Sequence, residues 1–272
     1  MYEGMSRTHC QGYVGLVANG EFEKANELIK DKIPLPACIG RVCPHPCEDA
    51  CRRGLVDEPI SIAMIKRFAG DMDIAAEERF IPDMEEDTGK TVAIIGGGPM
   101  GLSAAYFLRQ RGHEVTIFDS MPKLGGMLRY GIPEYRLPKE VLDAEIAIME
   151  AMGIQIVPNT KVGVDIPLDT IRNDFDAVVL GIGAWLSTGV GCPGEDAEGV
   201  IGGIDFLRRV VRNEYIDLGK NVAIVGGGNT AMDACRTAVR LGAENVYNIY
   251  RRTKHEMPAD MIEIEEGEEE GV

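Results

Sequence analysis

Residues 90–105 read KTVAIIGGGPMGLSAA, and this stretch decides the fold. Its apolar run Val92–Ile95 is typical of a short buried strand, and residues 100–111 have the composition of a helix. The turn between them has the pattern G-x-G-x-x-G, whose glycines are Gly96, Gly98 and Gly101. The first allows a tight turn, the second lets the backbone approach a pyrophosphate, and the third lets the helix pack closely on the strand. The stretch predicts a dinucleotide site.

The residues around this loop complete the pattern. The N-terminus of the following helix would face the phosphates with free N–H groups. Pro99, which follows Gly98 in the loop, is counted with the glycines as a candidate cofactor-binding residue. A second strand is predicted over Val115–Phe118, and Asp119 ends it 18 residues after Gly101. An acid about 20 residues on hydrogen-bonds a ribose hydroxyl in such sites. The alternative is a glycine-rich turn without a ligand, which the presence of every part of the pattern disfavours.

A second copy of the same unit begins near residue 222. Strands are predicted over Val222–Val225 and Val246–Tyr250, with a helix over Thr230–Leu241 between them. The turn matches the variant G-x-G-x-x-A. Its candidate cofactor-binding residues are Gly226, Gly228, Asn229, Thr230 and Ala231.

The end of the second copy differs in charge from the first. Arg251 lies 20 residues past Ala231 and is followed by Arg252, where the first copy has an acid. An arginine fork binds a 2′-phosphate with charge-assisted hydrogen bonds, whereas an acid would repel it. This site should therefore prefer NADP(H), unless the two arginines only solvate a strand end. Two such loops suggest two dinucleotides, and a flavin with a nicotinamide is the natural pair.

The alternation of strands and helices after residue 90 predicts parallel sheets and an α/β fold. Further elements are expected as a helix over Pro138–Met152, a strand over Ala177–Leu180 and the start of a charged helix over Glu263–Val272. The acidic stretch 82–89 is typical of a linker. We expect three domains: a helical cysteine-rich domain over residues 1–80, a first Rossmann-like nucleotide-binding domain over 88–188, and a second, incomplete one over 189–272.

The region before the linker is expected to be helical around a cysteine loop. Helices are predicted over Glu21–Lys30 and Pro59–Asp71. Pro34 and Pro36 are expected to forbid helix and to open the loop that holds the cysteines.

The N-terminal region holds five candidate metal ligands, which are Cys10, Cys38, Cys43, Cys47 and Cys51. Soft thiolates at tight spacing suit iron–sulfur clusters or zinc. Zinc is disfavoured because the paired C-x₂-C spacing is missing; unliganded thiols are the third reading. His45 is a further possible ligand, and Cys192 and Cys235 are expected to be buried packing residues.

The composition excludes several classes. The formal net charge is −16, so the basic footprint of nucleic-acid binding is missing and anionic membrane surfaces would repel the chain. No apolar run approaches the roughly 20 residues of a membrane helix, and the first residues lack the apolar core of a secretory signal. We expect a cytoplasmic protein without nucleic-acid or membrane partners.

At these motifs the chain resembles the small (β) subunit of NADPH-dependent glutamate synthase and its relatives, NADPH:ferredoxin oxidoreductases and the N-terminal part of dihydropyrimidine dehydrogenase. The resemblance covers nearly the whole chain. It is carried by Gly40–Gly54, Asp57–Ile62, Ala93–Ala105, Gly125–Asp143, Gly181–Trp185, Ala223–Ala243 and Tyr250–Ala259.

The resemblance implies FAD at the first loop, NADPH at the second and [4Fe–4S] clusters in the N-terminal domain. It also implies that Gly125, Gly126 and Met127 lie near the flavin. Electrons would pass from NADPH through FAD and the clusters to a partner, which would be a glutamate synthase large subunit or a ferredoxin-type acceptor. No side-chain acid–base catalyst is expected, since hydride transfer depends on positioning.

The chain departs from this family at both ends. Two clusters would need about eight ligands, and the N-terminal region offers five cysteines. Lys66 stands where some relatives have a further ligand. The family's downstream flavin-contacting Gly-Asp segment is missing, so we expect a truncated protein.

Two other functions compete with electron transfer. A degenerate, partner-binding scaffold would explain the thin ligand set. A flavin disulfide reductase is disfavoured, because no cysteine lies between Cys51 and Cys192 to form a redox pair beside the flavin.

Overall fold

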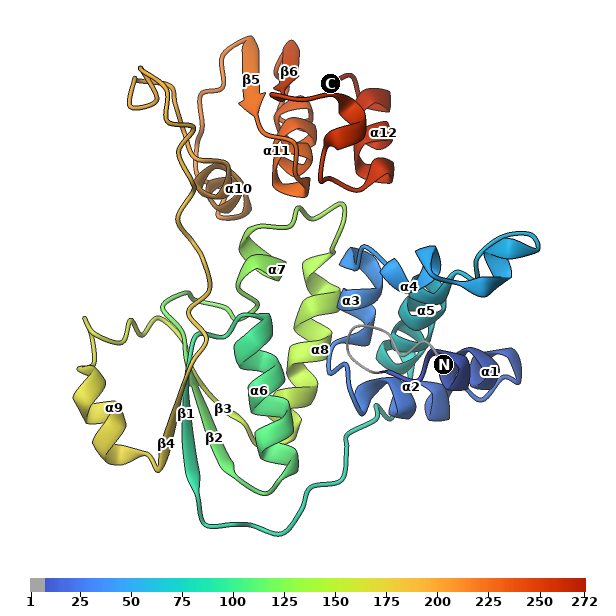
Figure 1. The fold of residues 1–272 in the computed structure, drawn as a ribbon. Coiled ribbons are helices and arrows are strands. Elements are labelled where there is room, and N and C mark those ends of the chain that lie inside the picture. The colour runs from blue at the N-terminus through green and yellow to red at the C-terminus, as the bar shows by residue number, and fades with distance from the viewer. Residues whose placement is uncertain (1–7) are drawn as a thin grey trace. The chain divides into compact units, whose positions relative to one another are not determined.

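The computed structural model describes residues 8–272, which fall into two compact units. The first runs to Leu128 and resumes over Arg136–Gly183; the second consists of Arg129–Tyr135 and Ala184–Val272. Figure 1 shows the helices and strands of both. The first unit holds the cysteine-rich helices together with a sheet, so the three-domain division stays a prediction.

The sheet of the first unit has four parallel strands in the order β3-β2-β1-β4. Their bounds are β1 Thr91–Ile95, β2 Glu114–Phe118, β3 Gln155–Val157 and β4 Ala177–Leu180. Val92–Ile95 of β1 are buried, as expected of a parallel strand covered on both faces. The predicted α/β fold with a parallel sheet is confirmed.

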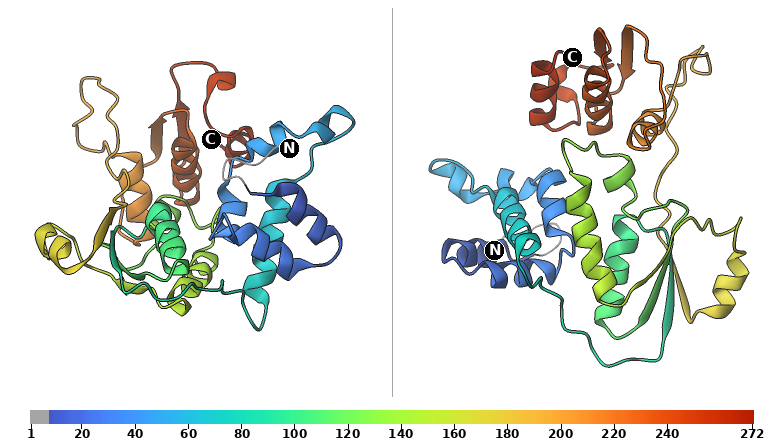
Figure 2. Two further views of the ribbon diagram at one scale, coloured as in Figure 1. Left: turned by 60° about the horizontal axis from the view of Figure 1, so that its bottom comes forward. Right: turned by 180° about the vertical axis from the view of Figure 1, so that it is seen from behind.

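Helices cover both faces of this sheet. Figures 1 and 2 show α6 (Pro99–Gln110) and α8 (Lys139–Ala151) on one side and α9 (Leu168–Asp174) on the other. Ile171 of α9 packs in one apolar cluster with Ala93 and Phe118. The short helix α7 (Met127–Tyr130) lies between α6 and α8 in sequence.

The described residues before the sheet form a small helical bundle. Its elements are α1 Cys10–Ala18, α2 Phe22–Lys30, α3 Pro36–Val42, α4 Pro46–Asp49, the 3₁₀ turn η1 Arg52–Leu55, and α5 Ile62–Ala75. Tyr13, Ala25 and Ile29 form its core with Ile62 and Ala69. The bundle buries the apolar faces of α1, α2 and α5 against one another.

The predicted cysteine loop is wrong in part. Pro36 begins α3 and Pro46 begins α4, each in the first turn, where the missing N–H would have no partner inside the helix. Cys38 and Cys47 are therefore helical. His45, between the two helices, has the left-handed backbone angles φ 38° and ψ 49°.

The second unit contains a parallel pair of strands, β5 (Asn221–Val225) and β6 (Asn245–Ile249). Its other elements are α10 Gly203–Val211, α11 Asn229–Arg240, the 3₁₀ turn η2 Lys254–Glu256, and α12 Met261–Glu269. Cys235 is buried in its core, as predicted, whereas Cys192 is exposed and that part of the prediction is wrong. None of the described helices is long and apolar enough to cross a membrane.

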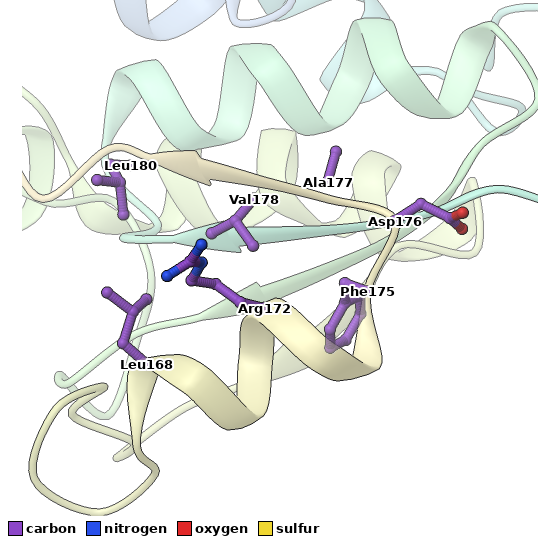
Figure 3. A pocket seen from close by; sticks show the side chains of 7 residues that line it. All are labelled: Leu168, Arg172, Phe175, Asp176, Ala177, Val178 and Leu180. Atoms are coloured by element: carbon purple, nitrogen blue, oxygen red, sulfur yellow. The ribbon is translucent and has the colours of Figure 1, made fainter.

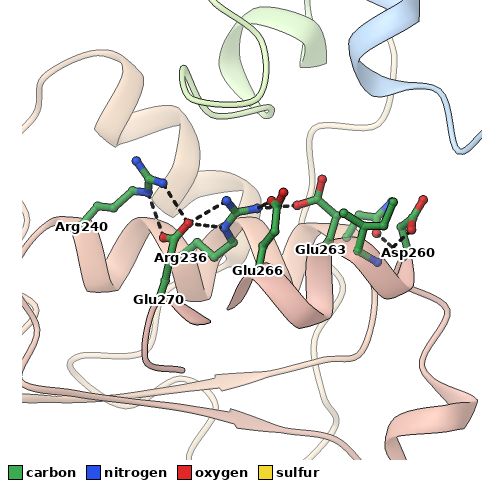
Figure 4. A network of polar contacts seen from close by, with 8 residues as sticks. Arg236, Arg240, Asp260, Glu263, Glu266 and Glu270 are labelled. Atoms are coloured by element: carbon green, nitrogen blue, oxygen red, sulfur yellow. Dashed lines mark hydrogen bonds and ion pairs between the residues drawn. The ribbon is translucent and has the colours of Figure 1, made fainter. Parts of the chain in front are cut away.

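A charge network joins α11 to α12 (Figure 4). The nearly buried guanidinium of Arg236 contacts Glu263 at 2.7 Å, Glu266 at 2.6 Å and Glu270 at 2.7 Å. Arg240 contacts Glu270 at 2.8 Å and is half-exposed. The three carboxylates thus converge on one buried cation.

Replacing Arg236 should destabilise the second unit. Arg236→Ala leaves the carboxylates facing one another without their cation, and we expect the free energy of unfolding to fall by about 2–3 kcal/mol. Arg240→Ala is the matched control, because an exposed pair contributes about 1 kcal/mol or less. Urea denaturation measures both. Equal losses in the two variants would contradict a central role for Arg236.

Candidate cofactor sites

The first glycine loop lies where β1 turns into α6, as predicted. Gly96 has φ +105°, and a Cβ there would lie 2.4 Å from the carbonyl oxygen of Gly181. A Cβ at Gly101 would lie 1.8 Å from the carbonyl oxygen of Gly96. Gly98 precedes α6 and faces open space apart from the Cα of Gly126 at 3.6 Å. The loop therefore has the close packing and the approachable backbone that a pyrophosphate needs.

Asp119 lies beside this loop and is buried. Its carboxylate accepts hydrogen bonds from the N–H of Gly97 at 2.6 Å and of Met121 at 2.7 Å. Each carboxylate oxygen can accept a further bond. Asp119 therefore holds the loop in shape, and its contact with a ribose stays a prediction.

The structure brings the Gly125–Met127 segment against the same loop. The N–H of Gly125 donates to the carbonyl oxygen of Gly97 at 2.8 Å. Gly125 and Gly126 have φ +126° and +51°, which favours glycine at both positions. Met127 begins α7. The family resemblance predicts that this segment lies near a flavin. No local sequence pattern indicates that it contacts the glycine loop.

The second glycine loop joins β5 to α11 in the same manner. Gly226 has φ +151°, and Gly228 precedes α11 with nothing within 4 Å of an added Cβ. Thr230 and Ala231 lie in the first turn of α11. The Asn229 side chain accepts the N–H of Asp260 at 2.9 Å, so its amide oxygen supports the loop from within the protein.

Sequence reasoning missed the residues that brace this loop. The ring of Tyr250 lies against Gly227, where an added Cβ would come within 2.6 Å of it. The N–H of Ala259 donates to the carbonyl oxygen of Gly227 at 3.0 Å. The paired glycines could have indicated a close neighbour, but no local pattern identifies which residue supplies it.

Arg251 and Arg252 come after β6, separated from it by Tyr250, and both are exposed. No ion pair or hydrogen bond holds either guanidinium among residues 8–272 of the structure. The neighbouring Lys254 pairs with Glu268 at 2.7 Å instead. Two adjacent cations without acidic partners can receive a phosphate, because no internal bond has to be broken first.

The predicted metal ligands divide into two groups. Cys10 and Cys47 pack against the apolar cluster that contains Tyr13. Burial, followed by Cys10 and then by Cys47 and Cys43, raises the pKa of the Tyr13 phenol. Burial, followed by the charges of Cys10 and Cys43, also raises the pKa of Cys47. Cys47 therefore lies within electrostatic reach of Cys10 and Cys43.

Cys51 ends the short segment that begins at Cys43. Backbone hydrogen bonds, the strongest from Ile60 and the next from Arg53, lower the pKa of its thiol. Backbone N–H groups stabilise a thiolate and tune sulfur ligands in iron–sulfur sites. The same backbone hydrogen bonds therefore favour the thiolate form of Cys51.

Cys38 differs from the other four. It is fully buried in α3, where burial and then Glu145 raise the pKa of its thiol. Its backbone N–H donates to the Glu145 carboxylate on α8 at 2.9 Å.

The donor chemistry fits an iron–sulfur cluster, but the ligand set is only partly assembled. Among residues 8–272, no three His, Cys, Asp or Glu side chains lie close enough together to hold a metal ion. Lys66 is buried, its charge opposes the rise in the pKa of Cys47 without reversing it, and it is no ligand while protonated. Cys10, Cys38, Cys43, Cys47 and Cys51 stay the predicted ligands of a cluster.

A hollow of about 380 Å³ lies between α9 and β4 (Figure 3). Its lining consists of Leu168, Arg172, Phe175, Asp176, Ala177, Val178 and Leu180. Arg172 already pairs with Asp169 at 3.5 Å. The hollow contains none of the predicted site residues.

Residues 90–272 match the pyridine nucleotide-disulphide oxidoreductase family, and residues 5–78 match the family described as dihydropyrimidine dehydrogenase domain II, 4Fe-4S cluster. The NADP(+)-dependent formate dehydrogenase subunit beta of Moorella thermoacetica is 44% identical over 96% of this chain and 40% of its own length. The glutamate synthase [NADPH] small chain of Escherichia coli is 39% identical over 97% of this chain and 59% of its own.

Among solved structures, FprA of Mycobacterium tuberculosis in complex with NADPH has a TM-score of 0.58 at 22% identity, over 66% of this chain and 47% of its own. At this identity the similarity shows the fold. The chain spans 40%, 59% and 47% of the lengths of these three proteins, in the order in which they are named here.

Proposed function

This chain belongs to the pyridine nucleotide-disulphide oxidoreductase family, and from that premise we propose that it is a cytoplasmic electron-transfer subunit that uses NADPH, FAD and an iron–sulfur cluster to supply a partner protein with electrons. The observation that supports this proposal most directly is the pair of glycine loops with approachable backbone. The second loop is followed, after β6, by two exposed arginines that have no ion pair among the described residues. The N-terminal match to a 4Fe-4S family supports the cluster.

Residues on each loop have separate tasks in this proposal. Gly96, Gly98 and Gly101 let the FAD pyrophosphate approach the N-terminus of α6, while Asp119 keeps the loop in shape. Gly226 and Gly228 do the same for NADPH, and Arg251 and Arg252 receive its 2′-phosphate. FAD supplies the conversion of a hydride into single electrons.

The partner is proposed from the names of the relatives. Both curated relatives are named as subunits, one of a formate dehydrogenase and one of a glutamate synthase. We propose a larger subunit as the electron acceptor, with a glutamate synthase large subunit as the first candidate. The second candidate is the partner of the formate dehydrogenase subunit, which is 44% identical to this chain against 39% for the glutamate synthase subunit.

Reduction of bound flavin tests this function. We expect the whole chain, incubated with FAD and freed of excess, to keep a visible flavin spectrum that NADPH bleaches without oxygen. NADH should bleach it far more slowly, because it lacks the 2′-phosphate. Iron analysis after anaerobic incubation with iron and sulfide is the second measurement. Folded protein that retains neither flavin nor iron would support the scaffold reading instead.

A further inference from the structure

Among the five N-terminal cysteines, Cys38 alone is completely removed from solvent. Cys10 and Cys47 pack against the apolar cluster that contains Tyr13, whereas Cys38 lies beside Glu145 of α8, to which its N–H donates. Cys38 is thus surrounded by a different set of groups from the other cysteines.

Glu145, on α8, closes the N-terminal end of α3. One of its carboxylate oxygens accepts the N–H of Ala37 at 2.8 Å and the other accepts the N–H of Cys38 at 2.9 Å. These two N–H groups lie in the first turn of the helix, where no partner inside the helix is available. Glu145, Ala37 and Cys38 are all buried, so water cannot take its place.

The opposite side of α3 is held by α5. A Cβ at Gly40 would lie 2.6 Å from the Cα of Arg67, and a Cβ at Gly70 would lie 2.5 Å from the N of Ala37. The two backbones therefore touch. Arg41 adds a two-pronged ion pair to Asp71, at 2.7 and 3.0 Å.

Fixing α3 also fixes Cys43. Cys43 follows the last residue of α3, and its N–H donates to the carbonyl oxygen of Ile39 at 3.0 Å. The helix α8 that carries Glu145 is in turn bonded to α6, through Arg109 Nε and the carbonyl oxygen of Met152 at 2.8 Å. A chain of direct contacts thus runs from Cys43 through Glu145 to the helix that begins at the first glycine loop.

We propose that Cys38 is not a cluster ligand, and that Glu145 and Cys38 together are positioning residues that fix α3, and with it the Cys43 sulfur, against α8. This reverses the assignment of Cys38 made from spacing alone. The ligand half of the proposal rests on the proposed function, because it needs a cluster to be present.

Iron content tests the ligand half. We expect Cys38→Ala, after reconstitution with iron and sulfide, to keep the iron per chain and the visible cluster absorption of the unchanged protein. Cys43→Ala should lose both. Cys38→Ser, which replaces the buried sulfur by an oxygen and so nearly keeps the size of the side chain, is measured beside Cys38→Ala in case the smaller side chain unfolds the bundle. Loss of iron from a folded Cys38 variant to the level of Cys43→Ala would overturn the assignment.

Amide hydrogen exchange tests the positioning half without any cofactor. In Glu145→Ala we expect the amides of Ala37 and Cys38 to exchange at least about tenfold faster, since their acceptor is gone. Glu150→Ala, an exposed acid on the same helix, is the matched control and should leave them unchanged. Unaltered exchange in Glu145→Ala would refute the positioning role of Glu145. If the protein without substitutions takes up no iron, the iron–sulfur cluster of the proposed function is refuted. The exchange rates would still show whether Glu145 holds the N-terminal end of α3.

Discussion

Replacing Arg251 and Arg252 together by alanine is expected to raise the KM for NADPH about a hundredfold and to leave the KM for NADH nearly unchanged. Each guanidinium would lose a charge-assisted hydrogen bond to the 2′-phosphate, at about 1.5 kcal/mol or more for each bond. The two losses together amount to about 3 kcal/mol, which is roughly a hundredfold in affinity. NADH has no group for these side chains to bind. Flavin reduction by each nucleotide, followed by absorbance, measures both values.

The control for this pair is the double variant Arg209→Ala with Arg212→Ala in the same unit. It removes the same two charges from the unit, but both side chains already pair with Glu214, at 3.4 and 3.1 Å. If the two double variants weakened NADPH equally, the effect would come from general charge and the assignment of Arg251 and Arg252 would be wrong. Equal weakening of NADPH and NADH would place the arginines on a part common to both nucleotides.

The glycine loops could be predicted from sequence because their determinants are local. The turn at Gly96 has φ +105°, and a Cβ at Gly101 would lie 1.8 Å from the carbonyl oxygen of Gly96. Both positions therefore require glycine, at a fixed spacing, whatever the rest of the chain does. The strands and helices beside both loops follow the sequence prediction within one or two residues. These parts of the site depend on a dozen consecutive residues.

The cysteine region could not be predicted in the same way. Pro36 and Pro46 are compatible with a loop or with the first turn of a helix, and the choice is made by packing of α3 on α5. The surroundings of Cys38 depend on Glu145, which is 107 residues away in sequence. A buried acid inside a helix has no local pattern that names its partner. Spacing therefore grouped five cysteines that the fold separates.

A second large effect is expected at Gly101. In Gly101→Val the added Cβ would lie 1.8 Å from the carbonyl oxygen of Gly96, so α6 must move away from β1. Such overpacking against rigid backbone should cost about 3 kcal/mol in the free energy of unfolding, and the displaced helix can no longer present its N-terminus to a pyrophosphate. We expect the protein to retain no FAD after gel filtration, with a clear loss of stability in urea.

A second substitution separates binding from folding at the same loop. Gly98 has an extended backbone, and the nearest atom to an added Cβ is the Cα of Gly126 at 3.6 Å, so Gly98→Ala should fold normally. Its methyl group would occupy the space through which a pyrophosphate approaches, and we expect FAD affinity to fall at least about tenfold. Gly15→Ala, in open space on α1, is the control and should bind flavin as before. If the Gly98→Ala protein is stable and binds FAD with undiminished affinity, the phosphates do not approach the backbone at Gly98, because the methyl group would lie in their path there.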